Sequence, residues 1–396
     1  MDTTQPLALL GGLSPQAFMK RHWQKRPLLI RNAVPEFNSA LAASGAGAPL
    51  APLASLASLA RAALFDLAAH DSVESRLISQ HTGKEKWQMK SGPFPRRSLP
   101  ALKQPKWTLL VQGLDLHHDG IRALMDRFRF VPDARLDDVM ASYATPGGGV
   151  GPHFDSYDVF LLQVQGRRRW QISQQKDLTL VDGAPLKILA NFAPEQTYVL
   201  EPGDMLYLPP RCAHDGVALD ECITYSIGFQ APKRGDLARE LLLRLADDAP
   251  DEVGPALYGD AKQAAVSSPG EIPPPLHEFA QAALARAVRD PAVLARALGE
   301  LLTEPKSNVW FEAGGAGRAS DGARGRVELD RRTKMMFDTQ HIFINGESFS
   351  ASGRDASLMK RLADGRFLEA RDLARCSADA RSLLGNWIEA GWIHER

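Results

Sequence analysis

The stretch GVGPHFDSYDVFLLQVQGRRRWQIS, residues 149–173, constrains the fold more than any other part of the chain. Its apolar runs and the Gln165-Gly166 pair between them predict a β-hairpin, whose first strand runs from His153 to Val164. Side chains alternate between the two faces of a strand, so an imidazole and the carboxylate of Asp155 share one face. Burying such groups is costly unless each has a partner. The hairpin therefore predicts a ligand inside the fold.

A metal ion is the ligand that His153 and Asp155 favour, and the predicted third ligand is His214, in EPGDMLYLPPRCAHDG. It lies 61 positions after His153 (214 − 153), a separation that suits two distant strands meeting across a barrel. Two histidines and one carboxylate leave coordination positions open, which is typical of non-haem Fe(II) oxygenases. The alternative is ordinary structural histidines, because an HxD pair is common by chance and the chain has ten histidines.

Arg168 follows the hairpin turn and has the parity of the apolar Trp170, so its guanidinium is expected to face the interior. A buried guanidinium needs an anion, and its planar fork suits a carboxylate. One interpretation is a structural salt bridge to Asp158 or Asp204. The other is that Arg168 binds the distal carboxylate of a dicarboxylic 2-oxo acid that chelates the metal, with a further hydrogen bond from Ser142.

Short β-rich runs separated by turn residues dominate the middle of the chain and leave little room for crossover helices. This pattern of short strands without helices between them predicts an antiparallel barrel or double-sheet roll of the cupin type within an α+β protein. The runs are WTLLVQGLD, MASYATPG, YDVFLLQV, RRRWQIS, TYVLEPGDMLYLPP and CITYSIGFQAP.

Composition and spacing divide the rest of the chain. Residues 1–100 are expected to form an N-terminal α/β layer on the barrel of residues 101–232. Residues 233–312 have apolar residues at helical spacing, and 313–325 are rich in small residues, as in a linker. Residues 326–396 predict a small winged-helix-like domain, with a hairpin in HIFINGESF at its Asn-Gly pair.

Charge and cysteine usage exclude several functional classes. Forty-seven Lys and Arg balance forty-seven Asp and Glu, so no global field attracts nucleic acid or an anionic membrane, although a local patch remains open. Three scattered cysteines do not make a disulfide framework or a cysteine zinc site. The N-terminus has no basic leader followed by a long apolar core. We therefore expect a cytoplasmic protein that associates with no membrane and binds no specific DNA.

The motifs PGGGVGPHFDSYDVF, QGRRRW, EPGDMLYLPP, HDG and YSIGFQAP together resemble the bacterial ribosomal oxygenases, which are JmjC/cupin-type 2-oxoglutarate-dependent protein hydroxylases. The resemblance is closest to the arginine-hydroxylase branch and covers residues of about 14–232. It implies that His153, Asp155 and His214 bind Fe(II), and that Ser142 and Arg168 bind 2-oxoglutarate, with O₂ as the second co-substrate.

The resemblance also implies a double-stranded β-helix core, a helical region that forms a homodimer, and a winged helix at the C-terminus. The implied substrate is C3 of an arginine in the sixteenth protein of the large (50S) ribosomal subunit. Tyr157 and Asp158, just past the ligands, are candidates to line the path of that arginine. An arginine substrate predicts acidic residues around the open coordination site, whereas a histidine predicts amides and hydroxyls.

Three other functions stay open at this point. A metal-dependent cupin isomerase or dioxygenase that uses no 2-oxo acid has no need of an inward Arg168. A DNA-binding regulator with the barrel as sensor is disfavoured by the neutral net charge and by the few cations in DARSLLGNWIEAGW. A JmjC hydroxylase or demethylase that acts on histidine or methyl-lysine shares the metal chemistry, and only the resemblance disfavours it.

Overall fold

The computed structural model describes residues 2–37, 59–81, 87–313, 325–350 and 352–396. The chain divides into two compact units, Met1–Ala231 and Pro232–Arg396, and each is described by itself.

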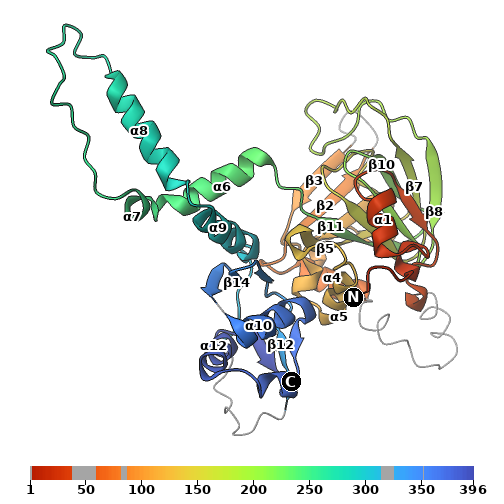
Figure 1. Ribbon diagram of the computed structural model, residues 1–396. Helices are drawn as coiled ribbons and strands as arrows, with labels where there is room; N and C mark the ends of the chain where they lie inside the picture. The colour runs from red at the N-terminus through yellow and green to blue at the C-terminus, as the bar shows by residue number, and fades with distance from the viewer. Residues whose placement is uncertain (1, 38–58, 82–86, 314–324, 351) are drawn as a thin grey trace. The chain divides into compact units, whose positions relative to one another are not determined.

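The first unit is the double-sheet roll that the sequence predicts (Figure 1). Its neighbouring strands pair antiparallel throughout. The large sheet has, in order, β1 (Leu28–Ile30), β9 (Met205–Leu208), β6 (Val159–Gln165), β11 (Cys222–Phe229), β5 (Leu136–Ala144), β4 (Trp107–Val111), β2 (Ser75–Gln80) and β3 (Trp87–Ser91). The small sheet has β10 (Ala213–Ala218), β7 (Arg168–Ser173) and β8 (Gln196–Leu200).

Strand alternation gives the large sheet two different faces. On β5, Val139, Ala141 and Tyr143 belong to the main hydrophobic core, whereas Ser142 has the opposite parity and faces into the roll. Register places Ser142 opposite Thr224 of β11, which is also buried. The inner face of the large sheet therefore carries buried polar side chains. Such side chains need a hydrogen-bond partner or a bound ligand.

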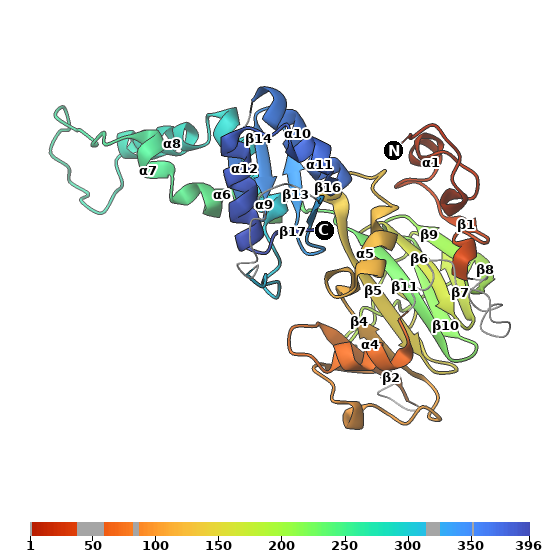
Figure 2. The same ribbon diagram turned by 90° about the horizontal axis from the view of Figure 1, so that it is seen from below.

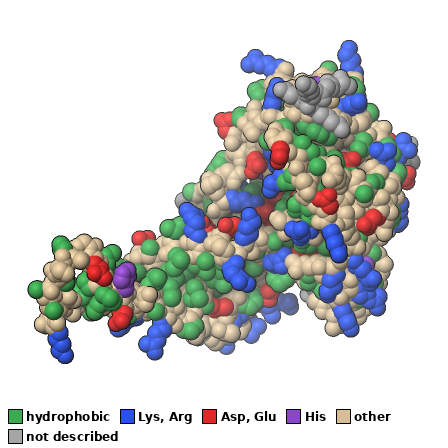
Figure 3. Space-filling model, turned by 90° about the horizontal axis from the view of Figure 1, so that it is seen from above, with side chains coloured by type: hydrophobic (Ala, Val, Ile, Leu, Met, Phe, Trp, Pro, Cys, Tyr) green, Lys and Arg blue, Asp and Glu red, His purple; other side chains and the backbone are tan. Residues whose placement is uncertain are grey.

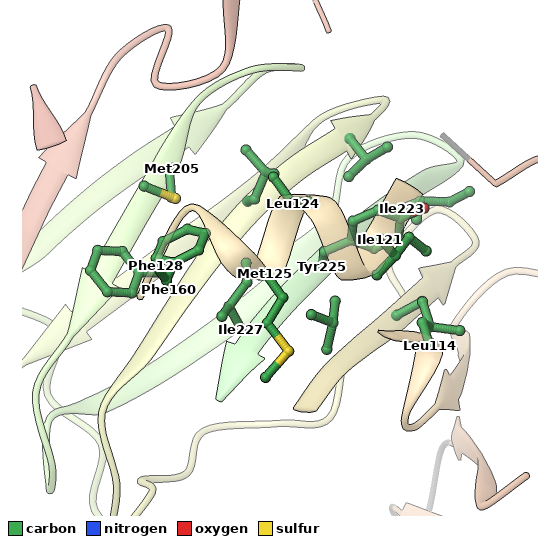
Figure 4. Packing of buried hydrophobic residues seen from close by; sticks show 14 of the residues in the cluster. Leu114, Ile121, Leu124, Met125, Phe128, Phe160, Met205, Ile223, Tyr225 and Ile227 are labelled. Atoms are coloured by element: carbon green, nitrogen blue, oxygen red, sulfur yellow. The ribbon is translucent and has the colours of Figure 1, made fainter. Parts of the chain in front are cut away.

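Helices cover the outer face of the large sheet and bury the main core (Figures 2 and 4). They are α1 (Pro15–Arg21), α4 (Arg61–Ala68) and α5 (Asp119–Asp126). Helix α1 has Ser14 as its N-cap, and the Ser14 hydroxyl accepts a hydrogen bond from the Ala17 amide at 3.2 Å. Figure 4 shows Ile121, Leu124 and Met125 of α5 packed over the sheet. This layer packs on the face of the large sheet that is opposite to the roll interior.

One predicted element is wrong in its bounds. The strand expected from His153 to Val164 begins only at Val159, and His153 instead forms an isolated β-bridge with His214. The cause is local: Gly151 takes a positive φ of 79° and Pro152 has no amide hydrogen, so a regular ladder cannot start here. Strand parity therefore does not govern residues 153–158.

The second unit begins with the helices α6 (Arg234–Ala246), α7 (Ala249–Val253), α8 (Pro274–Ala287) and α9 (Pro291–Thr303). Its C-terminal part has two three-stranded sheets, β16 (Phe367–Leu368), β12 (Val327–Leu329), β17 (Ile393–Glu395), and β13 (Met335–Phe337), β14 (His341–Ile344), β15 (Glu347–Ser350). Three helices complete it, α10 (Gly353–Gly365), α11 (Ala370–Leu373) and α12 (Ala378–Glu389). No helix within these described segments combines the length and the apolar character needed to cross a membrane.

The predicted hairpin in HIFINGESF is confirmed, with positive φ at Asn345 (49°) and Gly346 (90°). Helix α9 packs on this hairpin: Gly299 lies against the Phe343 ring, and the Thr303 hydroxyl accepts a hydrogen bond from the Gly346 amide at 3.2 Å. The small-residue stretch 313–325, expected to be a linker, falls almost entirely outside the described residues. The four domain boundaries remain predictions.

Candidate metal and co-substrate site

The structure brings His153, Asp155 and His214 together at one end of the roll. The two histidine backbones exchange hydrogen bonds of 2.9 and 2.8 Å, so their rings stand side by side with centroids 4.2 Å apart. One ligand atom from each of the three residues lies within 4.8 Å of the others. The Nε2 atom of His214 is 3.7 Å from the Asp155 carboxylate. These are separations that a single ion can bridge.

Backbone carbonyls orient both imidazoles. The Nδ1 atom of His153 lies 2.8 Å from the Gly151 carbonyl oxygen, and that of His214 lies 2.9 Å from the Cys212 carbonyl oxygen. A carbonyl can only accept, so each Nδ1 carries the proton and each Nε2 keeps its lone pair for a metal. Burial, reinforced by the neighbouring His153, lowers the pKa of His214. A neutral imidazole is the form that binds a metal.

The backbone of Asp155 is held by Arg211, which lies just before the strand of His214. The Arg211 amide donates a 2.7 Å hydrogen bond to the Asp155 carbonyl oxygen, and the Arg211 guanidinium lies 5.8 Å from the centre of the Phe154 ring. Arg211 has a φ of 66°, a left-handed conformation that disfavours residues other than glycine. These contacts tie the loop of Asp155 to the strand of His214.

Arg168 is buried, as its parity with Trp170 predicts, and only 3% of it is exposed. Its Nη1 donates to the Ser142 hydroxyl at 3.0 Å, and its Nη2 to the Ser142 carbonyl oxygen at 3.5 Å. Its Nε is buried and has no hydrogen-bond partner within the segments that the structure describes. A guanidinium that is taken out of water and not fully satisfied is strong evidence for a missing anionic partner.

The structural salt bridge that was the alternative for Arg168 is not formed. Asp158 is completely buried and accepts hydrogen bonds from Tyr207 (2.6 Å), Gln24 (3.2 Å) and Arg135 (3.4 Å). Asp204 is paired with Arg31 at 2.5 Å. Both acids are thus engaged elsewhere, and no acidic side chain in the described part of the chain pairs with Arg168.

The two candidates for the substrate path differ. Asp158 does not reach the surface, and its contacts stabilise the packing of α1 and β9 against β6, so its location is at odds with a place on that path. Tyr157 is 39% exposed. Partial burial, together with the carboxylates of Asp155, Asp138 and Asp137, raises its pKa. Tyr157 therefore stands in an acidic setting.

Asp138 is a site candidate that sequence reasoning missed. It lies on β5 four residues before Ser142, on the same face, and is 6% exposed. One carboxylate oxygen accepts a hydrogen bond from the Gly113 amide at 3.2 Å. The sequence did offer one signal: Asp138 and Ser142 are four residues apart on a strand, so their side chains are expected on the same face.

The residues present fit both implied groups. Two neutral imidazole nitrogens and one carboxylate oxygen form the donor set that suits Fe(II) and leaves coordination positions open. The incompletely satisfied guanidinium of Arg168, with Ser142 beside it, fits a carboxylate.

Comparisons with known proteins agree with this geometry. A JmjC domain model matches residues 123–237, which include all five of these side chains, and a ROXA-like winged-helix model matches residues 284–394. The ribosomal protein uL16 3-hydroxylase of Escherichia coli is 35% identical over 296 residues, covering 74% of this chain and 72% of that protein. The chain belongs to the JmjC-type ribosomal oxygenase family.

Other members agree over nearly the full length. A probable ribosomal oxygenase of Haemophilus influenzae is 26% identical over 96% of both chains. The solved structure of the Escherichia coli ribosomal oxygenase YcfD in complex with cobalt and 2-oxoglutarate is 28% identical, with a TM-score of 0.77 over 97% of this chain and 98% of that one. The predicted family and fold are confirmed, including the winged helix.

Proposed function

We propose that this protein is an Fe(II)- and 2-oxoglutarate-dependent oxygenase that hydroxylates the large-subunit ribosomal protein uL16, at C3 of an arginine. One observation carries the proposal: a buried Arg168 without an acidic partner shares the interior of one roll with a cluster of two histidines and a carboxylate. An isomerase that uses no 2-oxo acid has no use for this guanidinium.

In this proposal His153, Asp155 and His214 hold Fe(II), and Ser142 and Arg168 bind the distal carboxylate of 2-oxoglutarate. When bound, the iron and the 2-oxo acid supply the oxidation, in which O₂ and 2-oxoglutarate give succinate, CO₂ and the hydroxylated substrate. Arg168 neutralises the distal carboxylate where water is excluded, and the two fixed imidazoles keep the metal-binding atoms preorganised.

The acidic setting of Tyr157 supports arginine as the target residue. Burial and the carboxylates of Asp155, Asp138 and Asp137 raise the pKa of Tyr157, and the opposing guanidinium of Arg76 does not reverse this. A guanidinium is stabilised by such carboxylates, whereas the neutral imidazole of a histidine substrate gains less. Relatives named as bifunctional lysine-specific demethylases and histidyl-hydroxylases make this distinction necessary: the Dictyostelium discoideum protein is 33% identical over 28% of this chain, and the Aedes aegypti protein is 25% identical over 50% of it.

The proposal includes a homodimer and a place of action in the cytoplasm, where ribosomal proteins are made. Hydrophobic side chains gather over the helical part of the second unit (Figure 3), where the exposed apolar residues include Leu242, Leu243, Leu276, Phe279, Leu284 and Leu294. An apolar surface of this kind is typical of a subunit interface. Leu284→Asp should convert a dimer to a monomer, as measured by analytical ultracentrifugation.

The proposed reaction is tested by incubating the protein with Fe(II), 2-oxoglutarate, O₂ and purified uL16. Succinate should form in proportion to uL16 and not with an unrelated protein of similar charge. Asp155→Ala, which removes one metal ligand, is the control and should form none. If wild-type protein releases succinate at the same rate with and without uL16, the assigned substrate is wrong.

A further inference from the structure

A segment without acidic residues borders the roll. From Trp87 to Leu114 the chain has no Asp or Glu, although its net charge as a whole is zero. We call the part from Trp87 to Lys106 the basic rim. Its five cations are Lys90, Arg96, Arg97, Lys103 and Lys106.

All five cations of the basic rim are exposed. Arg96 is paired with Asp66 at 2.7 Å. In the segments that the structure describes, the other four side chains have no ion pair and no hydrogen bond. Among the described residues these four cations therefore form a local group of positive charge without paired carboxylates, which a neutral net charge conceals.

The basic rim lies at the edge of the large sheet, beside the metal-binding loop. Strand β3 pairs only with β2, so its other edge has no strand beside it within the described part of the fold. The Trp87 ring packs against Gly151, two residues before His153, and the Lys106 side chain packs against Gly147. Whatever binds the basic rim is thus held next to the loop that carries His153.

We propose that the basic rim binds the phosphate backbone of RNA. Four exposed cations in the segment from Lys90 to Lys106, none of them paired with a carboxylate of the described residues, match an array of repeated charges rather than a single anion. The free edge of β3 offers amide hydrogens as further phosphate donors. The partly exposed Trp87 supplies an aromatic ring on which an unstacked base can stack, and the exposed Met89 (37%) and Leu102 (41%) add apolar surface.

By binding RNA, the basic rim would bring the enzyme to a ribosomal protein that is itself bound to that RNA. The inference stands apart from the proposed reaction, because RNA binding is measured without turnover. A failure to bind RNA and a failure to hydroxylate uL16 are therefore separate results.

Fluorescence anisotropy with a labelled single-stranded RNA of mixed sequence tests the proposal on the full chain. With four phosphate contacts, the logarithm of the association constant should fall with the logarithm of the salt concentration, with a slope of about −2.8. Binding should therefore be about 50-fold weaker at 200 mM than at 50 mM salt. Arg97→Glu/Lys103→Glu should bind far more weakly at 50 mM salt. Its slope should fall to about −1.4, so that affinity changes only about sevenfold over the same range.

Lys20→Glu/Arg21→Glu is the matched control, because these two exposed cations at the end of α1 give the same change in net charge elsewhere in the same unit. It should bind RNA as the wild type does. Three results would overturn the proposal: no RNA binding by the wild type at 50 mM salt, equal losses in the two double variants, or binding of an acidic peptide as tightly as RNA. Circular dichroism of each variant verifies that it is folded.

Discussion

Replacing Arg168 with methionine should stabilise the ligand-free protein and abolish its response to 2-oxoglutarate. Arg168 is 3% exposed, and within the described residues its guanidinium donates hydrogen bonds to the hydroxyl and carbonyl oxygens of Ser142, both uncharged. A buried ion without a counter-ion loses several kcal/mol of hydration that such contacts do not repay. Methionine keeps the volume without the charge, so we expect the free energy of unfolding of the ligand-free protein to rise by about 1–2 kcal/mol.

Binding of 2-oxoglutarate should change in the opposite direction. Leaving its carboxylate buried without the guanidinium costs about 3–5 kcal/mol, which corresponds to a loss of affinity of roughly 100- to 4,000-fold. At 100 times its Kd the co-substrate stabilises the wild type by about 2.7 kcal/mol. The same concentration should leave the Arg168→Met variant almost unchanged. Arg168→Lys, which keeps the charge but not the planar fork, should lie between the two.

Urea unfolding with and without Mn(II) and 2-oxoglutarate measures both effects in one experiment. The matched control is Arg167→Met, since Arg167 is exposed and pairs with Asp220 at 2.9 Å, an interaction worth less than about 1 kcal/mol. This control should keep the full response to 2-oxoglutarate. If Arg168→Met responds to 2-oxoglutarate as the wild type does, Arg168 does not bind the co-substrate and the reasoning is refuted.

Three further predictions concern other parts of the molecule. Asp155→Ala should keep the fold, since this side chain is 24% exposed, but weaken Mn(II) binding in a calorimetric titration and stop succinate formation. Asp138→Asn keeps the shape of the acceptor for the Gly113 amide and removes its charge. It should weaken binding of a uL16 peptide by about tenfold, or about 1.4 kcal/mol, without affecting 2-oxoglutarate binding; an unchanged peptide affinity would exclude Asp138 from the substrate site. Gly299→Ala and Gly385→Ala are both in helices but should differ in sign. An added Cβ at Gly299 falls 2.3 Å from the Phe343 ring, so Ala lowers stability there, whereas Gly385 has open space and Ala raises stability by about 1 kcal/mol, as thermal unfolding would show.

Strand parity predicted the co-substrate side of the site because the strands there are regular. Arg168, Trp170 and Ile172 lie on one continuous strand, and all three are buried. Parity was misleading for residues 153–158, which form an irregular loop. His153 and Asp155 still converge with His214, because the β-bridge between the two histidines places them together without a regular strand.

The residues that the sequence could not assign depend on contacts between distant segments. Asp158 looked like a neighbour of the site, but it is bound by Gln24 and Tyr207, which are 134 and 49 residues away in the chain. Arg211 has a left-handed φ, which lets its amide donate a hydrogen bond to the Asp155 carbonyl oxygen. A sequence indicates such a φ at a glycine, but not at an arginine. The packing of α9 on its hairpin was hidden for the same reason, since Gly299 meets Phe343 only in the folded unit.

Tandem mass spectrometry of uL16 after reaction tests the central claim most directly. The wild-type enzyme, supplied with Fe(II) and 2-oxoglutarate under air, should add one oxygen atom to the side chain of a single arginine. The Arg168→Met variant should add none at a co-substrate concentration that saturates the wild type. Unmodified uL16, or an added oxygen on a histidine or lysine instead, would contradict the account.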